Sequence, residues 1–129
     1  MADSLRERAI QAAQKSHSPY SLAKVGSALE TTDGKIFGGC NIENSSFGGT
    51  VCAERVAIWK AVSEGHQQLK RIYVYTEAGW PPCGLCRQVM AEFASPQLEI
   101  VIGDGQGKET VWKFTDLLPL AFTPAHLKK

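Results

Sequence analysis

Apolar residues near the start of the chain recur at helical spacing. Leu5 and Ala9 are four residues apart, and further alanines continue the same stripe, which predicts an amphipathic helix over residues 4–16. Ser4 stands three residues before Glu7, which is the spacing of a capping box. The helix is therefore expected to begin at Ser4.

Two short strands and a long polar loop follow this helix. Residues 25–29 and 35–38 are predicted strands, and the Asp33-Gly34 pair between them suits a hairpin turn. Residues 38–50 are rich in Gly, Asn and Ser, which predicts a loop. A loop of this length in a compact domain usually carries function, so we expect it to contribute to a site.

The second half of the chain predicts a largely buried helix followed by a β-α-β unit. Apolar positions dominate residues 51–64, and Gly65 is a suitable C-terminal cap. A right-handed crossover would place the two strands of the next unit parallel. The elements expected after this helix are a strand at 72–76, a helix at 84–93, strands at 98–102 and 110–114, and a short helix at 116–118.

Composition narrows the class of protein. With 43% hydrophobic and 21% charged residues, the 129-residue chain is typical of a single domain spanning residues 1–129. The net charge is +1 and Lys and Arg are scattered, so a neutral small molecule is a more natural ligand than nucleic acid. The N-terminal residues carry charges of both signs and lead into no long apolar stretch. This argues against a signal peptide or a membrane span and favours the cytoplasm.

In a reducing compartment the four cysteines are better explained as metal-binding or catalytic thiols than as a disulfide frame. Cys52 begins one predicted helix, while Cys83 and Cys86 flank the start of another. A fold that joins the two helix ends would present three thiolates to one ion, and the positive ends of the helices would favour those thiolates. Sulfur ligands favour zinc, and three protein ligands leave the fourth tetrahedral position to water, as in catalytic sites.

Glu54 and Arg55 lie beside this cluster in the sequence. Arg55 is one turn or less from Cys52 and can hydrogen-bond a ligand sulfur, with a surface ion pair as the alternative. Glu54 is a candidate proton carrier, but it converges with Cys52 only if Cys52 stands at the very start of the helix. Thr50 is the expected cap of that helix. The alternative role for Glu54 is to compensate the helix dipole.

The chain contains Gly39-Cys-Asn-Ile-Glu-Asn44, Cys52-Ala-Glu-Arg55 and Pro82-Cys-Gly-Leu-Cys-Arg-Gln88. In their order and approximate spacing these three segments resemble the small cytidine deaminase family. Cys52-Ala-Glu54 with Pro82-Cys-Gly-Leu-Cys86 matches the three-cysteine form of the zinc deaminase signature. Further similarity at Pro19-Tyr-Ser, Val25-Gly26, Leu117-Leu-Pro and Phe122 extends the resemblance over almost the whole chain.

The resemblance implies an α/β fold, a three-layer α/β/α sandwich with a central mixed sheet. It implies one zinc ion per subunit, held by Cys52, Cys83 and Cys86, with Glu54 shuttling protons. The implied reaction is the hydrolytic deamination of cytidine and 2'-deoxycytidine in pyrimidine salvage. The implied assembly is a homotetramer in which neighbouring subunits complete each active site.

The resemblance also implies the substrate contacts. Asn41 and Glu43 would hold the ribose 3'-hydroxyl, and the backbone around Ala53 would meet the pyrimidine ring. Phe122 would stack on the base across a subunit interface. From the residues alone, a polar loop explains Asn41 and Glu43 equally well, and a core position explains Phe122. Phe47 is a further candidate for the wall of the pocket.

Two positions depart from the family pattern and leave other functions open. Ala23 and Lys24 stand where many members carry an aromatic residue and a proline, so the pocket floor is expected to be wider or rebuilt. A nucleoside antibiotic such as blasticidin S is therefore an alternative substrate. From other classes, Cys40 could close a four-sulfur structural zinc site in a non-enzymatic module, or Cys83 and Cys86 could form a redox pair.

Overall fold

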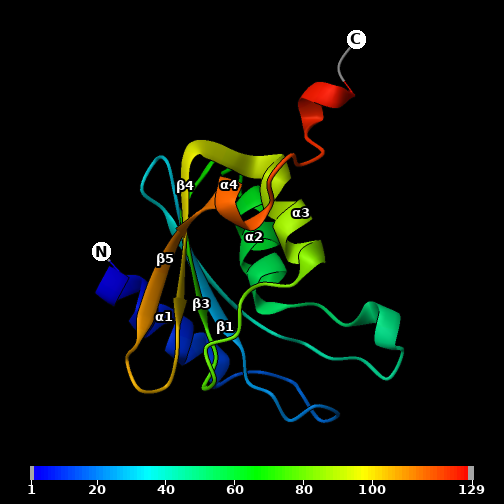
Figure 1. The fold of residues 1–129 in the computed structure, drawn as a ribbon. Helices are drawn as coiled ribbons and strands as arrows, with labels where there is room; N and C mark the ends of the chain where they lie inside the picture. Colours follow the sequence, from blue (N-terminus) through cyan, green and yellow to red (C-terminus); the bar gives the residue numbers. More distant parts are fainter. Residues whose placement is uncertain (1, 128–129) are drawn as a thin grey trace.

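The computed structural model describes the backbone of residues 2–127 and the side chains of residues 5–127. Helices and strands alternate along most of the chain (Figure 1). The elements in order are α1 (Ala2–Ala13), β1 (Gly26–Thr31), β2 (Ile36–Cys40), η1 (Phe47–Gly49), α2 (Ala53–Ser63), β3 (Leu69–Tyr75), α3 (Gly84–Phe93), β4 (Ala94–Gly103), β5 (Glu109–Lys113), α4 (Phe114–Leu117) and η2 (Pro124–His126). Within residues 2–127, none of the helices is long and apolar enough to cross a membrane.

The strands form one mixed sheet in the order β2-β1-β3-β4-β5. The pair β3 and β4 is parallel, as predicted for the β-α-β unit, and α3 connects the two strands. The other neighbours are antiparallel. The predicted hairpin turn is also present, with Gly34 at a φ of 86° between β1 and β2. This arrangement confirms the expected mixed sheet.

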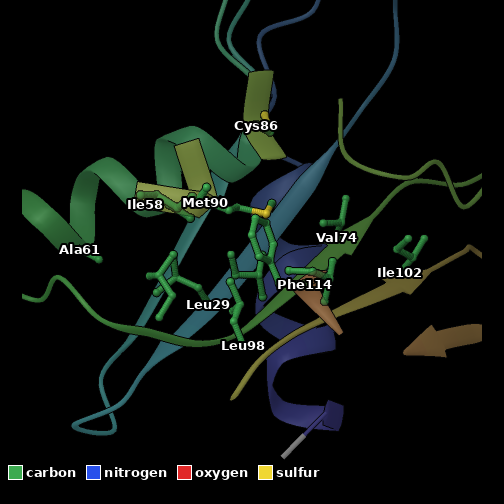
Figure 2. Close-up of a cluster of buried hydrophobic side chains, with 14 residues drawn as sticks. Leu29, Ile58, Ala61, Val74, Cys86, Met90, Leu98, Ile102 and Phe114 are labelled. Carbon is green, nitrogen blue, oxygen red and sulfur yellow. The ribbon is translucent and has the colours of Figure 1, made fainter. Parts of the chain in front are cut away.

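Helices cover both faces of the sheet, with α1 on one side and α2 and α3 on the other (Figure 1). Alternate strand residues point to opposite faces, as the two-residue repeat of a strand requires. Ala28 and Tyr73 pack with the α1 side chains Leu5 and Ala9. The larger cluster in Figure 2 lies under α2 and α3 and includes Leu29, Ile58, Ile72, Val74, Met90, Leu98 and Ile100. The three-layer α/β/α sandwich is therefore confirmed.

Two glycines allow the helices to approach the sheet closely. A Cβ atom at Gly26 would lie 1.8 Å from the backbone oxygen of Ala9 in α1. On the other face, a Cβ atom at Gly39 would lie 2.6 Å from the backbone nitrogen of Ala57 in α2. Both contacts involve helix backbone, which cannot turn away as a side chain can. These positions therefore set the spacing of the layers around β1 and β2.

The ends of the first helix differ from the prediction. It begins at Ala2 and ends at Ala13, so Ser4 lies inside the first turn instead of at the cap, and the helix is shorter than 4–16. At the other end of the chain, α4 begins at Phe114, two residues before the predicted start. A capping-box pattern identifies a place where a helix can begin but does not prevent an extra turn before it.

Gly26→Ala is expected to destabilise the fold by about 1–3 kcal/mol or more, because the added methyl group collides with helix backbone. The measurement is the midpoint of urea-induced unfolding at fixed protein and zinc concentrations. Gly48→Ala is the matched control, since a Cβ atom there meets nothing within 4 Å, and its effect is expected to stay within about 0.5 kcal/mol. Equal midpoints for the two variants would contradict this account of the layer spacing.

Candidate metal centre and adjoining cavity

Two helices begin at the same place in the fold, and a cysteine stands immediately before each. Cys52 is the N-cap of α2 (φ −76°, ψ 155°) and Cys83 is the N-cap of α3 (φ −71°, ψ 167°). Both residues have extended backbone, and the Cys83 sulfur accepts a hydrogen bond from the Cys86 amide at 3.4 Å. The predicted Thr50 cap is therefore wrong, because the extended chain reaches two residues further before α2 begins. Cys52 thus stands at the very start of α2, which is the position that allows its side chain and that of Glu54 to converge.

The sulfur atoms of Cys52, Cys83 and Cys86 lie within 4.8 Å of one another, although Cys52 and Cys83 are 31 residues apart in the chain. Cys86 is buried in the first turn of α3 (Figure 2). The Sγ atoms of Cys52 and Cys83 are 3.7 Å apart. Tetrahedral coordination with Zn–S bonds of about 2.3 Å places ligand sulfurs about 3.8 Å apart. The three thiols therefore fit a zinc ion in both chemistry and spacing.

The surroundings of Cys52 favour its thiolate form. A hydrogen bond from the Cys86 thiol lowers the pKa of Cys52 to about 5, against the opposing effect of burial, and the Arg55 guanidinium lowers that pKa further. The same hydrogen bond, together with burial, raises the pKa of Cys86. The two shifts favour the negative charge on Cys52 and the proton on Cys86. A metal ion that binds all three sulfurs must displace it.

Arg55 points its guanidinium at the cluster, as predicted. Its Nη2 donates a hydrogen bond to Cys52 Sγ at 3.5 Å, and its Cζ lies 5.8 Å from the ring centre of Trp59. No surface ion pair holds Arg55 among the described residues. The cation offsets part of the charge that three thiolates concentrate in one place.

Glu54 is buried beside the thiols, with 3% of its surface exposed. Its Oε1 accepts no hydrogen bond from the described residues, which is unusual for a buried carboxyl group. Burial raises the pKa of Glu54 to about 7, and the negative Cys52 thiolate contributes to the rise. A buried carboxyl group with an open oxygen and a pKa near neutrality is suited to accept and return a proton.

A cavity of about 320 Å³ lies in front of Glu54. Pockets for small ligands start at about this size, so it suits a molecule as small as a nucleoside. Of the predicted site residues, it brings together Asn41, Glu43, Cys52, Ala53, Glu54 and Cys83. Two of the three thiols, Cys52 and Cys83, thus line the cavity together with Glu54.

Asn41 and Glu43 hold a neighbouring segment in addition to lining the cavity. Asn41 accepts a hydrogen bond from the Val25 amide at 3.0 Å and donates one to the Ala23 carbonyl at 2.9 Å. Glu43 accepts hydrogen bonds from the Tyr20 amide and from the amide and hydroxyl of Ser21. An amide and a carboxylate each retain bonding capacity after these contacts. The two side chains therefore shape the cavity wall and still offer polar atoms.

The two aromatic candidates lie outside this cavity. Phe122 is 54% exposed, stacks on His126 at 5.4 Å and belongs to the C-terminal segment that extends from the body (Figure 1). The alternative that Phe122 is a core residue is therefore wrong. Phe47 is 73% exposed and packs edge-to-face against Tyr20 at 5.6 Å, beside the cavity wall at Glu43.

The fourth cysteine is not part of the cluster. Among the described residues, only Cys52, Cys83 and Cys86 form a group able to hold a metal ion. Cys40 lies at the end of β2 and lines a separate cavity with residues of α1 and with Lys60. A closed four-sulfur site is therefore not formed in this fold.

Several residues of the cavity wall were not identified from the sequence. Trp80 and Pro81 could have been suspected, because they precede Cys83 by only two or three residues. Ser21 belongs to the Pro19-Tyr-Ser segment of the resemblance, but its contact with Glu43 could not be predicted, since it depends on the path of the loop between α1 and β1. Ala23, expected at the pocket floor, also lines the cavity. The other unpredicted lining residues are Val25, Thr50, Val51, Val74 and Thr76.

Three thiols at two helix starts, with a buried glutamate beside them, are the features of zinc-dependent deaminases. The sequence agrees, because residues 2–102 match the family described as the cytidine and deoxycytidylate deaminase zinc-binding region. The chain belongs to this family. The resemblance noted in the sequence is thereby confirmed, and zinc is the metal of the site.

Individual relatives cover most of the chain. A cytidine deaminase of Halalkalibacterium halodurans is 46% identical over 121 residues, which cover 92% of each chain. The crystal structure of a cytidine deaminase from Burkholderia pseudomallei has a TM-score of 0.90 and 45% identity, covering 95% of this chain and 99% of that one. The enzyme from Mycobacterium tuberculosis has a TM-score of 0.81 and 36% identity, covering 94% and 96%.

Cys83→Ser is expected to weaken zinc binding by more than the roughly 10–100-fold typical of changes outside the ligand shell, because it removes one of three ligands. Zinc affinity can be measured by competition with a chromogenic chelator. Cys40→Ser is the matched control and should retain wild-type affinity, since Cys40 lies away from the cluster. An equal loss of affinity in both variants would refute the three-sulfur site.

Proposed function

We propose that this chain hydrolyses cytidine and 2'-deoxycytidine to uridine and 2'-deoxyuridine and releases ammonia. The observation that supports this most directly is the meeting of Glu54 with three thiols at one end of a nucleoside-sized cavity. Membership of the cytidine and deoxycytidylate deaminase family supports the same reaction. The net charge of +1 and the scattered Lys and Arg residues of the chain also suit an uncharged nucleoside.

Cys52, Cys83 and Cys86 would hold zinc, which would activate a water molecule for attack on the base. Glu54 takes a proton from the attacking water and delivers it to N3 of the cytosine ring as C4 becomes tetrahedral. The Glu54 carboxylate then takes the remaining proton from the C4 hydroxyl and passes it to the amino group. The C4–N4 bond breaks, the C4=O bond of uracil forms, and ammonia leaves. Burial of Glu54 keeps competing water away from this proton.

The remaining site residues would hold the substrate and the ligands in place. The free bonding capacity of Asn41 and Glu43 suits the ribose 3'-hydroxyl, and the Ala53 backbone lies beside Glu54, where the ring would sit. Arg55 would neutralise part of the thiolate charge through its hydrogen bond to Cys52.

The alternatives weighed from the sequence receive less support. Curated relatives at 41% to 46% identity over about nine-tenths of the chain are cytidine deaminases, which favours cytidine over an antibiotic such as blasticidin S. A redox pair of Cys83 and Cys86 leaves the third thiol and the open carboxyl group of Glu54 unexplained.

The wider context is proposed on similar grounds. We propose one domain over residues 1–129, because a single sheet joins all the described strands. The four free cysteines suit the reducing cytoplasm. The product of the proposed reaction, a uracil nucleoside, suits a role in pyrimidine salvage. A homotetramer with shared active sites is supported by large apolar side chains that one chain leaves exposed, among them Leu22, Phe47, Leu120, Phe122 and Leu127.

Glu54→Gln should lower kcat for cytidine at least about 10²–10⁴-fold, because the amide cannot carry the proton. Loss of cytosine absorbance and release of ammonia measure the rate. Zinc content should be unchanged, since Glu54 is not one of the three thiols. A Gln variant with wild-type turnover would remove Glu54 from the mechanism.

Phe122→Ala should lower kcat/KM, and the defect should be repaired by subunits that carry Glu54→Gln. Co-folded mixtures contain sites that combine an intact Glu54 with an intact Phe122 from a neighbour. Their activity should therefore exceed the sum of the two separate variants. Additive activity in mixed tetramers would place Phe122 outside the neighbouring site.

A further inference from the structure

A second cavity, of about 400 Å³, adjoins the proposed active site. Its wall includes Ile10 and Ala13 of α1 and Tyr75, whose ring packs in the cluster under α1. The active-site cavity, in contrast, is lined by Ala53 and Glu54 of α2. The two cavities therefore lie toward opposite faces of the sheet, at the end where β1 begins and β3 ends.

Three residues line both cavities and form the wall between them, namely Ala23, Thr76 and Trp80. Ala23 is tied to the proposed ribose end, because its carbonyl accepts a hydrogen bond from Asn41. Trp80 lies at the metal end, three residues before Cys83. The shared wall therefore runs along the length that a bound nucleoside would occupy.

The chemistry of deamination determines which edge of the base faces this wall. Glu54 must reach N3, so the N3 and O2 edge of cytosine faces the start of α2, where Ala53 and Glu54 lie. The wall residues, in contrast, precede β1, follow β3 and lie in the loop before α3, and they also line the cavity next to α1. The opposite edge of the ring, which carries C5 and C6, therefore faces Ala23, Thr76 and Trp80.

Trp80 is the bulky part of the wall. Thr76 is buried and Ala23 has only a methyl group, whereas the Trp80 side chain is large and 53% exposed. Its backbone amide donates a hydrogen bond to Thr76 Oγ1 at 2.7 Å, which fixes the main chain of the loop. The indole itself donates no hydrogen bond to the described residues. Truncation of this side chain would thus open the wall while the loop stays anchored.

We propose that Trp80 determines substrate specificity by closing the active-site cavity at the C5 edge of the base, and that the adjoining cavity accepts an apolar C5 substituent of a cytosine nucleoside once the indole is reduced. The adjoining space suits an apolar group because Ile10, Ala13, Leu22 and Ala78 line it. Its polar lining residues Gln14, Lys24 and Glu77 are exposed and can remain in water. The proposal rests on the proposed function, because it needs cytidine deamination as its reference reaction.

The test compares kcat/KM for cytidine and for 5-phenylcytidine in the wild type, Trp80→Leu and Trp80→Ala. The ratio of the two constants cancels general damage to the site. The kcat/KM for 5-phenylcytidine divided by the kcat/KM for cytidine should rise at least about tenfold in Trp80→Ala. The rise should be intermediate in Trp80→Leu. Adding Ile10→Trp to Trp80→Ala fills the adjoining cavity and should reverse the gain.

Trp112→Ala is the control, because Trp112 lies on β5 and lines neither cavity. Its ratio should equal that of the wild type. A ratio that stays constant across the Trp80 series while cytidine is still turned over would overturn the proposal, and so would a gain that survives Ile10→Trp. If wild-type protein loaded with zinc leaves cytidine unchanged, the proposed function fails instead, so the two failures are distinguishable.

Discussion

The convergence of three thiols from two helix starts is the constraint on which the rest of the site depends. Cys52 and Cys83 are separated by 31 residues, yet their sulfur atoms lie 3.7 Å apart. The fold achieves this by starting α2 and α3 at the same end of the sheet, with an extended cysteine before each helix. The positive helix ends, together with Arg55, favour sulfur in its charged form. A zinc ion would link the two helices as well as serve the chemistry.

The same negative cluster explains the state of Glu54. A buried carboxyl group beside a thiolate is costly to ionise, which is why its pKa rises to about 7. Its free oxygen is an unfavourable feature for stability alone. Both properties suit a group that exchanges a proton with a substrate in the adjoining cavity. The close packing that Gly26 and Gly39 allow on either face of the sheet supplies the rigidity that such a site requires.

The sequence predicted the parts of this arrangement that local patterns control. Periodicity located α2, α3 and the parallel pair of strands, and cysteine spacing located the metal ligands. The start of α2 was misplaced by two residues, because Thr50 is as good a cap as Cys52 when the path of the loop is unknown. The contact of Ser21 with Glu43 and the wall formed by Trp80 depend on long loops that have no periodic pattern. Assignment of Asn41 and Glu43 to the site required the family resemblance, because a polar loop has the same composition.

The account's central claim is that one zinc ion on three thiolates enables Glu54 to deaminate cytidine. The most direct test is to strip the protein with a chelator and titrate zinc back while following the loss of cytosine absorbance. The account predicts that turnover of cytidine rises linearly and reaches its maximum at one zinc per chain, with protons released as the Cys86 thiol ionises. Cytidine turnover that does not depend on zinc, or a fully loaded protein that leaves cytidine intact, would contradict it.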